Sequence, residues 1–460
     1  MKKIIKFFTS KTFIIGTLLL IQLIFIFFLV NWLVNDNIIG VYVHAIFQIL
    51  SFFIGLWIIS NDDNPVYKIA WLIPILVFPV FGTFFYIFYQ NINMSEKEKT
   101  LYFAISEKRI SNLKAFAKEP ITKEMSYLNI LGWQTFDNTT SHFITSGMEK
   151  LELLLEDLKK AEDFIFMEYF IITKGEMFNQ MFDILIDKAK NGVKVKVIYD
   201  DFGSSDKLPR NFKKTMKNAG IEVIAFNPMR LHINFAMNYR DHRKIVVIDG
   251  KIGYTGGINI GDEYINKKER FGYWHDAAIR IEGEAVFSLT TTFLEIWSFS
   301  KREDNPNFQE YYRNYKVESD GLVLPFADSP LDNDETTRNV YLYLIGRAKK
   351  RIWVATPYLI LDNELITALK LAALSGVDVS IIIPHIPDKK LVYIVTQSYI
   401  PELVRAGVKV YRFTPGFIHS KLIIIDDDAG IVGTSNLDFR SLYLHFENNI
   451  LIYNTNSLKD

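Results

Sequence analysis

Three long hydrophobic runs fill the first part of the chain. Phe13 to Val34 and Ile38 to Ser60 contain no charged side chain, and a third run extends from Ile69 to Tyr89. A helix of about 20 apolar residues is long enough to cross a hydrocarbon core, so the first two runs predict membrane spans. Pro74 and Pro79 break or kink a helix, so the third run is predicted either to span or to dip in and return.

Basic residues on both sides of these runs predict their orientation. Four lysines precede Phe13, and Lys97, Lys99, Lys108 and Arg109 follow the third run. Lys and Arg are enriched in cytoplasmic loops, so both outer flanks are expected in the cytoplasm, which requires an even number of crossings. The first run is long and lacks a small-x-small cleavage site, which favours an uncleaved anchor over a signal peptide. We therefore expect a multi-pass protein of the cell membrane, with a re-entrant third segment and a cytoplasmic globular part.

Beyond these runs, hydrophobic positions follow the periods of strands and helices in turn. Phe164–Ile172 is a continuous apolar run typical of a buried strand, Met177–Ala189 carries a helical apolar stripe, and Val193–Tyr199 is the next predicted strand. The same strand, helix, strand order returns later in the chain, at Arg351–Tyr358, Leu361–Ser375 and Val377–Pro384. Short turns between such elements indicate parallel α/β organisation.

These patterns divide the chain into five segments. The predicted segments are a membrane anchor (1–91), a connector with a helix or two (92–140), a first lobe (141–300), a linker rich in Asn, Asp and Pro (301–335) and a second lobe (336–460). The first lobe opens with a predicted helix whose leucines form one apolar stripe, Met148–Lys160. The predicted fold class is therefore α/β: two similar lobes that form one active site at their interface, preceded by N-terminal transmembrane helices.

Composition narrows the functional classes. The chain has 52 Lys and Arg against 52 Asp and Glu, so no overall positive field recruits nucleic acid, and we expect no nucleic-acid partner. It contains no cysteine, which excludes disulfides, zinc-thiolate sites and cysteine nucleophiles. Hydrophobic residues make up 49% of the chain, with 37 phenylalanines, and most of this excess lies in the N-terminal runs.

One motif occurs once in each predicted lobe, with the form His-x-Lys-x4-Asp-x6-Gly-x-x-Asn. Its defined positions are His242, Lys244, Asp249 and Asn259 in the first copy, and His419, Lys421, Asp426 and Asn436 in the second. A single His-x-Lys on a strand is typical of a structural histidine, because so short a pattern arises easily by chance. Its duplication inside a duplicated fold favours a functional site.

The chemistry of the two copies suits a phosphodiester. Alternate residues of a strand share a face, so the histidine and lysine of each copy are predicted to point the same way. One imidazole could attack phosphorus and form a phosphohistidine, while the other protonates the leaving alkoxide and deprotonates the incoming hydroxyl. The lysines would neutralise the phosphoryl oxygens without a metal ion or another cofactor. The glycine-rich turns could bring Asn259 and Asn436 to the phosphate.

The remaining candidates have supporting roles. Strand parity keeps Asp249 and Asp426 out of direct catalysis, so turn-stabilising or orienting roles are expected for them within the catalytic motif. Asp276 and Glu447 precede a strand in each repeat and could hold the second ring nitrogen of a histidine. Arg243 adjoins His242 and would favour a neutral imidazole there.

Some alternatives stay open at this point. Arginines near the motifs either contact phosphate or are ordinary surface residues: Arg240, Arg243 and Arg440. His275 and His445 are interpreted as wall residues. A metal site is disfavoured because a lysine two residues from each histidine would repel a cation, and no further ligand has suitable spacing.

These residues resemble the phospholipase D superfamily and, within it, bacterial cardiolipin synthases. The resemblance runs from about residue 40 to the end and rests on both motif copies together with Glu168-Tyr-Phe-Ile, Thr356-Pro-Tyr358, Ala372–Val379 and Gly256–Tyr264. It implies phospholipase D-like lobes and transfer of a phosphatidyl group between two phosphatidylglycerol molecules with release of glycerol. The usual nucleophile is a histidine of the first motif, so the resemblance favours His242.

The same resemblance leaves other reactions open. A membrane-bound phosphodiesterase that hydrolyses phospholipids would use the same phosphohistidine. A nuclease is disfavoured because nucleases of the superfamily generally have one motif per chain and no paired spans. Members of the family normally continue past the second repeat, so the end of this sequence at Asp460 leads us to expect a cost in stability or activity.

Overall fold

The computed structural model describes residue 28 and residues 38–61, 65–89, 94–228, 238–332 and 334–460. The chain forms two compact units, one ending at Met94 and a larger one that begins at Ser95 and includes almost all of the remaining chain. The predicted run Phe13 to Val34 lies outside the described residues.

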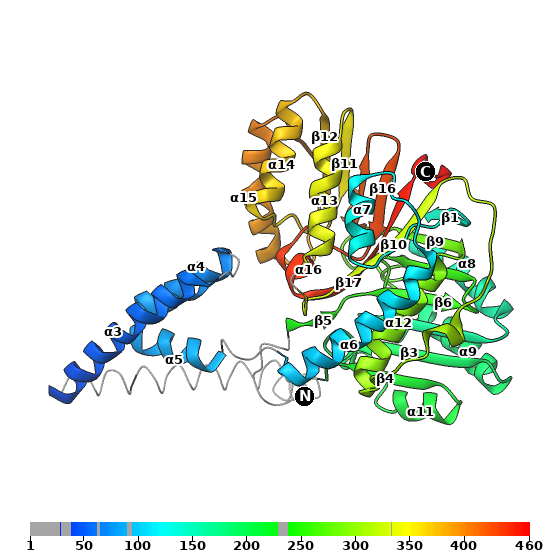
Figure 1. Ribbon diagram of the computed structural model, residues 1–460, viewed down its shortest axis with the longest axis horizontal. Coiled ribbons are helices and arrows are strands. Elements are labelled where there is room, and N and C mark those ends of the chain that lie inside the picture. Colours follow the sequence, from blue (N-terminus) through cyan, green and yellow to red (C-terminus); the bar gives the residue numbers. More distant parts are fainter. Residues whose placement is uncertain (1–27, 29–37, 62–64, 90–93, 229–237, 333) are drawn as a thin grey trace. The chain divides into compact units, whose positions relative to one another are not determined.

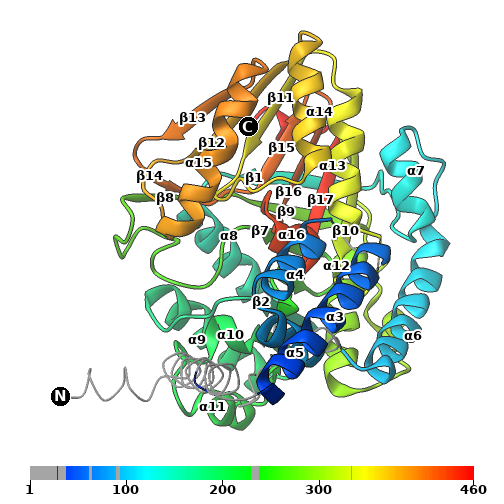
Figure 2. The same cartoon turned by 90° about the vertical axis from the view of Figure 1, so that its left-hand side faces the viewer.

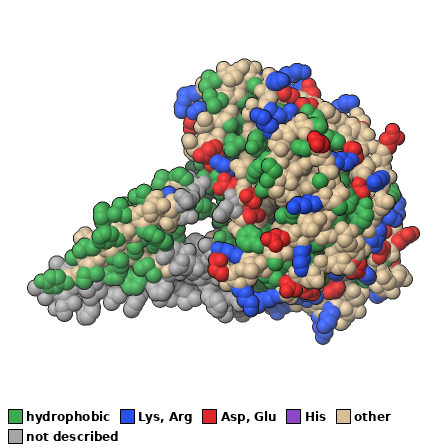
Figure 3. Space-filling view, viewed as in Figure 1, with side chains coloured by type: hydrophobic (Ala, Val, Ile, Leu, Met, Phe, Trp, Pro, Cys, Tyr) green, Lys and Arg blue, Asp and Glu red, His purple; other side chains and the backbone are tan. Residues whose placement is uncertain are grey.

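The smaller unit contains three helices that pack on one another: α3 (Ile38–Ser60), α4 (Pro65–Val77) and α5 (Pro79–Tyr89). The third hydrophobic run is thus broken into two helices, as its prolines predict. Gly82 lies directly against the Pro74 carbonyl, because a Cβ at Gly82 would meet that oxygen at 2.2 Å. Hydrophobic side chains cover much of the displayed surface of the described residues of this unit (Figure 3). Among the described residues, no helix is both long enough and apolar enough to cross a membrane.

The first lobe is built on a seven-stranded sheet with the order β1-β9-β7-β6-β2-β3-β4. Its strands are β1 (Thr139–Ile144), β2 (Phe164–Tyr169), β3 (Lys194–Asp200), β4 (Glu222–Phe226), β6 (Lys244–Ile248), β7 (Ile252–Gly256) and β9 (Ala278–Gly283). Only β2, β3 and β4 are parallel to one another, whereas β6, β7, β9 and β1 pair antiparallel. The sheet is therefore mixed rather than wholly parallel.

The second lobe repeats this topology with the order β10-β17-β16-β15-β11-β12-β13 (Figure 1). Its strands are β10 (Leu322–Asp328), β11 (Arg351–Ala355), β12 (Asp378–Pro384), β13 (Lys409–Phe413), β15 (Leu422–Ile425), β16 (Ala429–Gly433) and β17 (His445–Tyr453). Its large helices are α13 (Thr336–Arg347), α14 (Asn363–Leu374) and α15 (Lys390–Arg405). The two similar α/β lobes are confirmed. The predicted linker is partly wrong, because it contains the edge strand β10.

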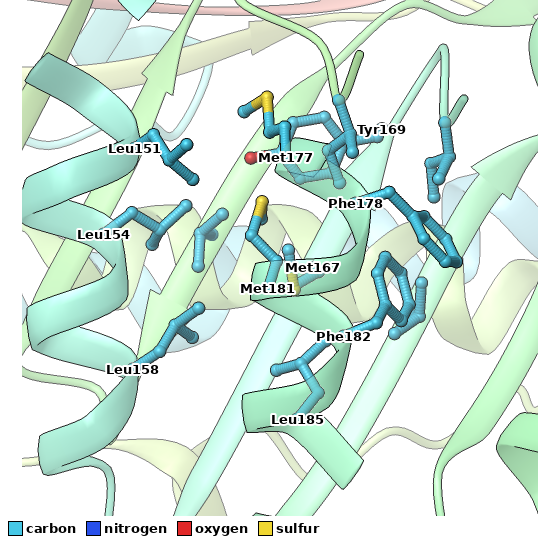
Figure 4. Close-up of a cluster of buried hydrophobic side chains, with 14 of the residues drawn as sticks. Leu151, Leu154, Leu158, Met167, Tyr169, Met177, Phe178, Met181, Phe182 and Leu185 are labelled. Carbon is cyan, nitrogen blue, oxygen red and sulfur yellow. The ribbon is translucent and has the colours of Figure 1, made fainter. Parts of the chain in front are cut away.

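Leucines and aromatic residues hold the helices of the first lobe on its sheet. Helix α8 (Gly147–Lys160) directs Leu151, Leu154 and Leu158 toward helix α9 (Glu176–Lys190), and Met177 and Met181 lie on the facing side of α9 (Figure 4). The leucine stripe therefore forms core, as predicted. Helix α12 (Val286–Lys301) is buried from Val286 to Phe299 and contacts β2 and β6 of the first lobe and β10 of the second. In the predicted connector, α6 (Glu96–Leu113) packs on α12, and α7 (Lys123–Ile130) contacts α13 (Figure 2).

Two short ladders join the lobes. Strand β5 (Arg240–Asp241) of the first lobe pairs in parallel with the start of β17 in the second lobe. Strand β14 (Gly416–Ile418) of the second lobe pairs in parallel with β8 (Tyr273–His275) of the first. Each ladder lies immediately before a motif histidine, so the exchange brings both motif copies to the boundary between the lobes.

Candidate active site

Each motif histidine is held by the opposite lobe. His242 follows β5, and its backbone N–H donates to the Phe446 carbonyl at 3.0 Å. His419 follows β14, and its N–H donates to the His275 carbonyl at 2.7 Å. The expectation that the histidines lie within strands is therefore wrong: β6 and β15 begin at Lys244 and Leu422, after the two rings.

The carboxylate partners are exchanged between the lobes. Nδ1 of His242, in the first lobe, lies 2.9 and 3.0 Å from the two oxygens of Glu447 in the second. Nδ1 of His419, in the second lobe, lies 2.6 Å from Oδ2 of Asp276 in the first. Both carboxylates are completely buried. An ionised carboxylate only accepts hydrogen bonds. Each neutral ring therefore carries its hydrogen on Nδ1 and keeps the Nε2 lone pair for a reacting group.

Burial controls the charge of these rings. It lowers the pKa of His242 to about 3, against an opposing effect of Glu447, and Lys244 lowers it further. Burial and the charge of Lys421 lower the pKa of His419 to about 4, against Asp276. Both rings are therefore neutral near pH 7 before a substrate enters. The two pKa values are shifted in the same direction and are not well separated.

The two lysines lie beside the histidines. The Lys244 ammonium donates to the backbone carbonyl of His242, and the Lys421 ammonium donates to that of His419. Burial lowers the pKa of Lys244 to about 7 and that of Lys421 to about 8. The charge of Lys421 is among the influences that lower the pKa of Lys244. The two lysines are therefore close enough to act on one phosphoryl group. An anion between them would favour both ammonium forms.

The motif aspartates stabilise turns instead of facing this site. Asp249 has a φ of 52°, and its carboxylate accepts hydrogen bonds from the backbone N–H groups of residues 162, 163 and 164. Asp426 has a φ of 53° and accepts from residues 349, 350 and 351 in the same way. Each carboxylate therefore holds the start of a central strand, β2 or β11. These contacts give both aspartates the turn-stabilising role that strand parity favours.

The motif asparagines are unequal. Oδ1 of Asn259 accepts from the Ile171 N–H at 3.0 Å, and its Nδ2 donates to the Tyr264 hydroxyl at 2.8 Å. Its amide is thus engaged within the protein. Oδ1 of Asn436 is buried and lacks a hydrogen-bond partner among the described residues. Phosphate binding by these two asparagines stays a prediction.

Arg243 occupies neither the phosphate-contacting position nor the surface position that the sequence left open for it. Its side chain is fully buried, its Nε donates to the Glu447 carbonyl at 3.2 Å, and its NH2 group donates to the Asp328 carbonyl at 3.1 Å. The guanidinium therefore lies behind the carboxylate of the site, where it cannot meet a phosphate. Burial is the largest influence that lowers the pKa of His242, and Lys244 lowers it further, so these two make that ring neutral.

Several neighbours of the rings escaped the sequence analysis. Phe170 lies edge-on to His242 with ring centroids 5.0 Å apart, and Trp274 lies 5.2 Å from His419. Glu168, on β2, is fully buried, and its burial together with the charge of Asp241 raises its pKa well above the ordinary value. In the sequence, the only sign of a role for Glu168 is that Glu168-Tyr-Phe-Ile belongs to the resemblance to the phospholipase D superfamily. The two aromatic side chains therefore pack beside the motif histidines.

His275 and His445 also differ from the simple wall residues predicted for them. Nδ1 of His275 lies 3.1 Å from the Ser420 hydroxyl. The ring of His445 lies 5.4 Å from that of His242, and its Nδ1 is 3.6 Å from Oε1 of Glu447. The pattern His-x-Glu on β17 could have placed His445 and Glu447 on one face, because alternate residues of a strand share a face.

Comparison with known proteins identifies the family. The family described as cardiolipin synthase, PLD-like domain, matches residues 154–297 and 341–460, and the family described as Phospholipase_D-nuclease N-terminal matches residues 49–89. A cardiolipin synthase from Alkalihalophilus pseudofirmus is 38% identical, over 94% of this chain and 87% of that protein. Cardiolipin synthase 2 from Bacillus cereus is also 38% identical, over 90% of this chain and 82% of that protein.

A solved structure supports the fold. The phosphatidylserine synthase of Haemophilus influenzae Rd KW20 superposes with a TM-score of 0.55 at 17% identity, covering 77% of this chain and 88% of that chain. The matched family residues contain both His-x-Lys copies and both carboxylate partners. This chain belongs to the family of phospholipase D-like cardiolipin synthases.

Proposed function

We propose that the protein is a cardiolipin synthase that transfers a phosphatidyl group between two phosphatidylglycerol molecules, giving cardiolipin and glycerol through a phosphohistidine. The observation that carries the proposal is the pair of buried histidines, each held by a carboxylate of the opposite lobe, in a chain 38% identical to cardiolipin synthases over most of its length. The reaction makes this chain a phosphatidyltransferase of the phospholipase D superfamily.

In the first half-reaction, Nε2 of neutral His242 attacks phosphorus while the hydrogen on Nδ1 stays on the ring and is donated to Glu447. The bond from phosphorus to the glycerol oxygen breaks, and protonated His419 gives that oxygen a proton. His419 is neutral in the empty site, because burial lowers its pKa to about 4, so the entering anionic phosphodiester has to stabilise the imidazolium. Asp276 holds the ring and balances its charge.

In the second half-reaction, His419 accepts the proton of a hydroxyl from a second phosphatidylglycerol, and that oxygen attacks the phosphohistidine. The bond from phosphorus to Nε2 breaks and His242 returns to its neutral form. The charges of Lys244 and Lys421 stabilise the phosphoryl oxygens throughout. Protons and charges balance over the two steps, and the residues named supply the acid, the base and the nucleophile.

The substrate class places the protein at a membrane. The exposed apolar residues of the N-terminal unit and the match of residues 49–89 support membrane attachment. We infer a multi-pass protein of the cell membrane that works on phosphatidylglycerol and other membrane phospholipids from the cytoplasmic side. A reporter fused after Asp460 tests the orientation, and a reporter active only outside the cell would contradict it.

The test of the reaction is product analysis with the full chain. Purified protein in phosphatidylglycerol-containing micelles should form cardiolipin and glycerol, and His242→Ala should form neither. Identical products from wild type and His242→Ala would overturn the proposal. Phosphatidic acid as the main product, without cardiolipin, would indicate a hydrolytic phospholipase instead.

A further inference from the structure

A third imidazole stands next to the nucleophile. His445 and Glu447 lie two positions apart on β17 and face His242 together. One ligand atom from each of these three residues lies within 4.8 Å of the others. Nδ1 of His445 is buried but makes no hydrogen bond to the described residues, and its nearest acidic atom is Oε1 of Glu447 at 3.6 Å. The chemistry of phosphatidyl transfer gives this ring no task.

The donor set suits zinc. Two imidazole nitrogens and a carboxylate bind Zn²⁺ at about 2.0–2.2 Å, with a fourth position left for water. Tetrahedral bonds of that length place ligand atoms roughly 3.3 Å apart. The separations from Glu447 Oε1 are 2.9 Å to His242 and 3.6 Å to His445, on either side of that value. An ion could therefore enter with small shifts of these side chains.

Neighbouring side chains orient the Glu447 carboxylate for such an ion. The Thr434 hydroxyl donates to the other oxygen of Glu447, and Arg243 holds its backbone carbonyl. Such outer hydrogen bonds orient metal ligands. The charge of Lys244 opposes a cation, so moderate affinity for the ion is expected.

The other half-site lacks the third ligand. Nδ1 of His275, the neighbour of Asp276, lies 3.1 Å from the Ser420 hydroxyl. Within the part of the chain that the structure describes, His242, His445 and Glu447 form the one group of His and acidic side chains close enough to hold an ion. A metal would thus act on one histidine of the pair and not on the other.

We propose that His242, His445 and Glu447 form an inhibitory site for Zn²⁺ or a similar borderline divalent cation. The ion replaces the hydrogen between His242 and Glu447 and binds Nδ1 of His242. A neutral imidazole carries one hydrogen, so the hydrogen lost from Nδ1 is regained on Nε2 through solvent. Nε2 then has no lone pair for phosphorus, and the nucleophile is switched off. This consequence rests on the proposed function, whereas metal binding itself does not.

Binding is measured first, because it does not depend on activity. Full-length protein in detergent is titrated with Co²⁺, followed by absorption of a tetrahedral site, and with Zn²⁺ in competition with a chromophoric chelator. We expect one ion per chain in wild type and in His419→Ala. In His445→Asn the affinity should fall at least about tenfold, since even the loss of an outer hydrogen bond costs about that much. No binding by wild-type protein would overturn the proposal.

Inhibition is measured next. Zn²⁺ should stop cardiolipin formation by wild type, and a chelator should restore it. His445→Asn should form cardiolipin without added metal and resist Zn²⁺ at least about tenfold better. His275→Asn is the matched control and should stay as sensitive as wild type. Equal sensitivity of His445→Asn and wild type would refute the site, whereas binding without any transferase activity would refute only the proposed reaction.

Discussion

The two histidine and carboxylate pairs are similar but not equal. Glu447 offers both oxygens to His242 and receives a further hydrogen bond from Thr434, whereas Asp276 offers one oxygen to His419. Glu447 therefore holds its ring through a more extensive hydrogen-bond network. Burial would raise the pKa of Glu447, but the charge and hydrogen bond of His242 hold it well below its ordinary range, so it stays ionised.

The first prediction concerns Glu447. Glu447→Gln keeps the shape of the side chain but removes the charge that holds the hydrogen of His242 on Nδ1. The hydrogen then occupies Nε2 in part of the molecules, and Nε2 has no lone pair for phosphorus in those molecules. We expect kcat to fall roughly 10²- to 10⁴-fold with little change in KM. Steady-state cardiolipin formation measures this, and the exposed Glu152→Gln serves as control. A variant with kcat within a factor of two of wild type would contradict the role.

The second prediction concerns pH. The ordinary histidine pKa of 6.5 falls to about 3 for His242 and about 4 for His419 in the folded protein. Between pH 6.5 and about 4, the unfolded chain binds protons that the folded site does not, so stability should fall as the pH falls through this window. Melting temperatures in steps of pH measure the slope. His242→Asn should flatten it and the exposed His385→Asn should not.

At the scale of elements, the motif aspartate Asp249 connects its own turn to the start of a neighbouring strand. Its positive φ and three accepted N–H groups anchor the start of β2 next to the end of β6. Asp426 does the same for β11. The central strands β2 and β11, which pair with β6 and β15, therefore depend on the aspartates for structural support.

The third prediction follows from this role. Asp249→Ala leaves three backbone N–H groups without their acceptor, so the free energy of unfolding should drop by about 1–3 kcal/mol. The kcat of the molecules that remain folded should be nearly unchanged. Denaturant unfolding and activity at low temperature measure both, with the exposed Asp183→Ala as control. Loss of activity in a fully stable variant would instead show a catalytic role.

At the scale of the whole molecule, buried polar contacts join the lobes behind the site. Arg243, from the first lobe, holds backbone carbonyls of Glu447 and Asp328 in the second. Acidic side chains surround the guanidinium: Glu168, Glu295 and Asp241 raise its pKa although burial lowers it. Its loss would remove the guanidinium beside Glu168 and Asp241, while Glu295 keeps its ion pair with Arg109, and would loosen the position of Glu447.

The fourth prediction tests this connection. Arg243→Ala should lower the free energy of unfolding by about 3–5 kcal/mol, as removal of one partner of a buried ion group does. Among molecules that still fold, kcat should fall while the KM for phosphatidylglycerol stays constant, because the arginine does not reach the substrate. The exposed Arg440→Ala is the control. A raised KM at unchanged stability would show that Arg243 contacts phosphate after all.

Local pattern accounts for much of the outcome. The leucine stripe of α8, the buried strand β2 and the break between α4 and α5 follow from hydrophobic periodicity and proline chemistry. The mixed sheet does not, because the apolar run of β6 is also typical of a parallel strand and local pattern does not set the direction of pairing. Strand β10 is an apolar run, but it contains Pro325, which argues against a strand, and it lies within the polar stretch that indicates a linker.

The amino-acid sequence by itself determined the two similar lobes, the two His-x-Lys copies and the identity of both carboxylates, because these depend on residue type and spacing along the chain. Only the tertiary structure decided that Glu447 serves His242 and Asp276 serves His419, that Arg243 turns away from the phosphate, and that His445 approaches the nucleophile. These relations come from the ladders β5 with β17 and β14 with β8, which join residues far apart in the chain. Such pairings depend on how whole lobes pack, and residue spacing along the chain does not determine that packing.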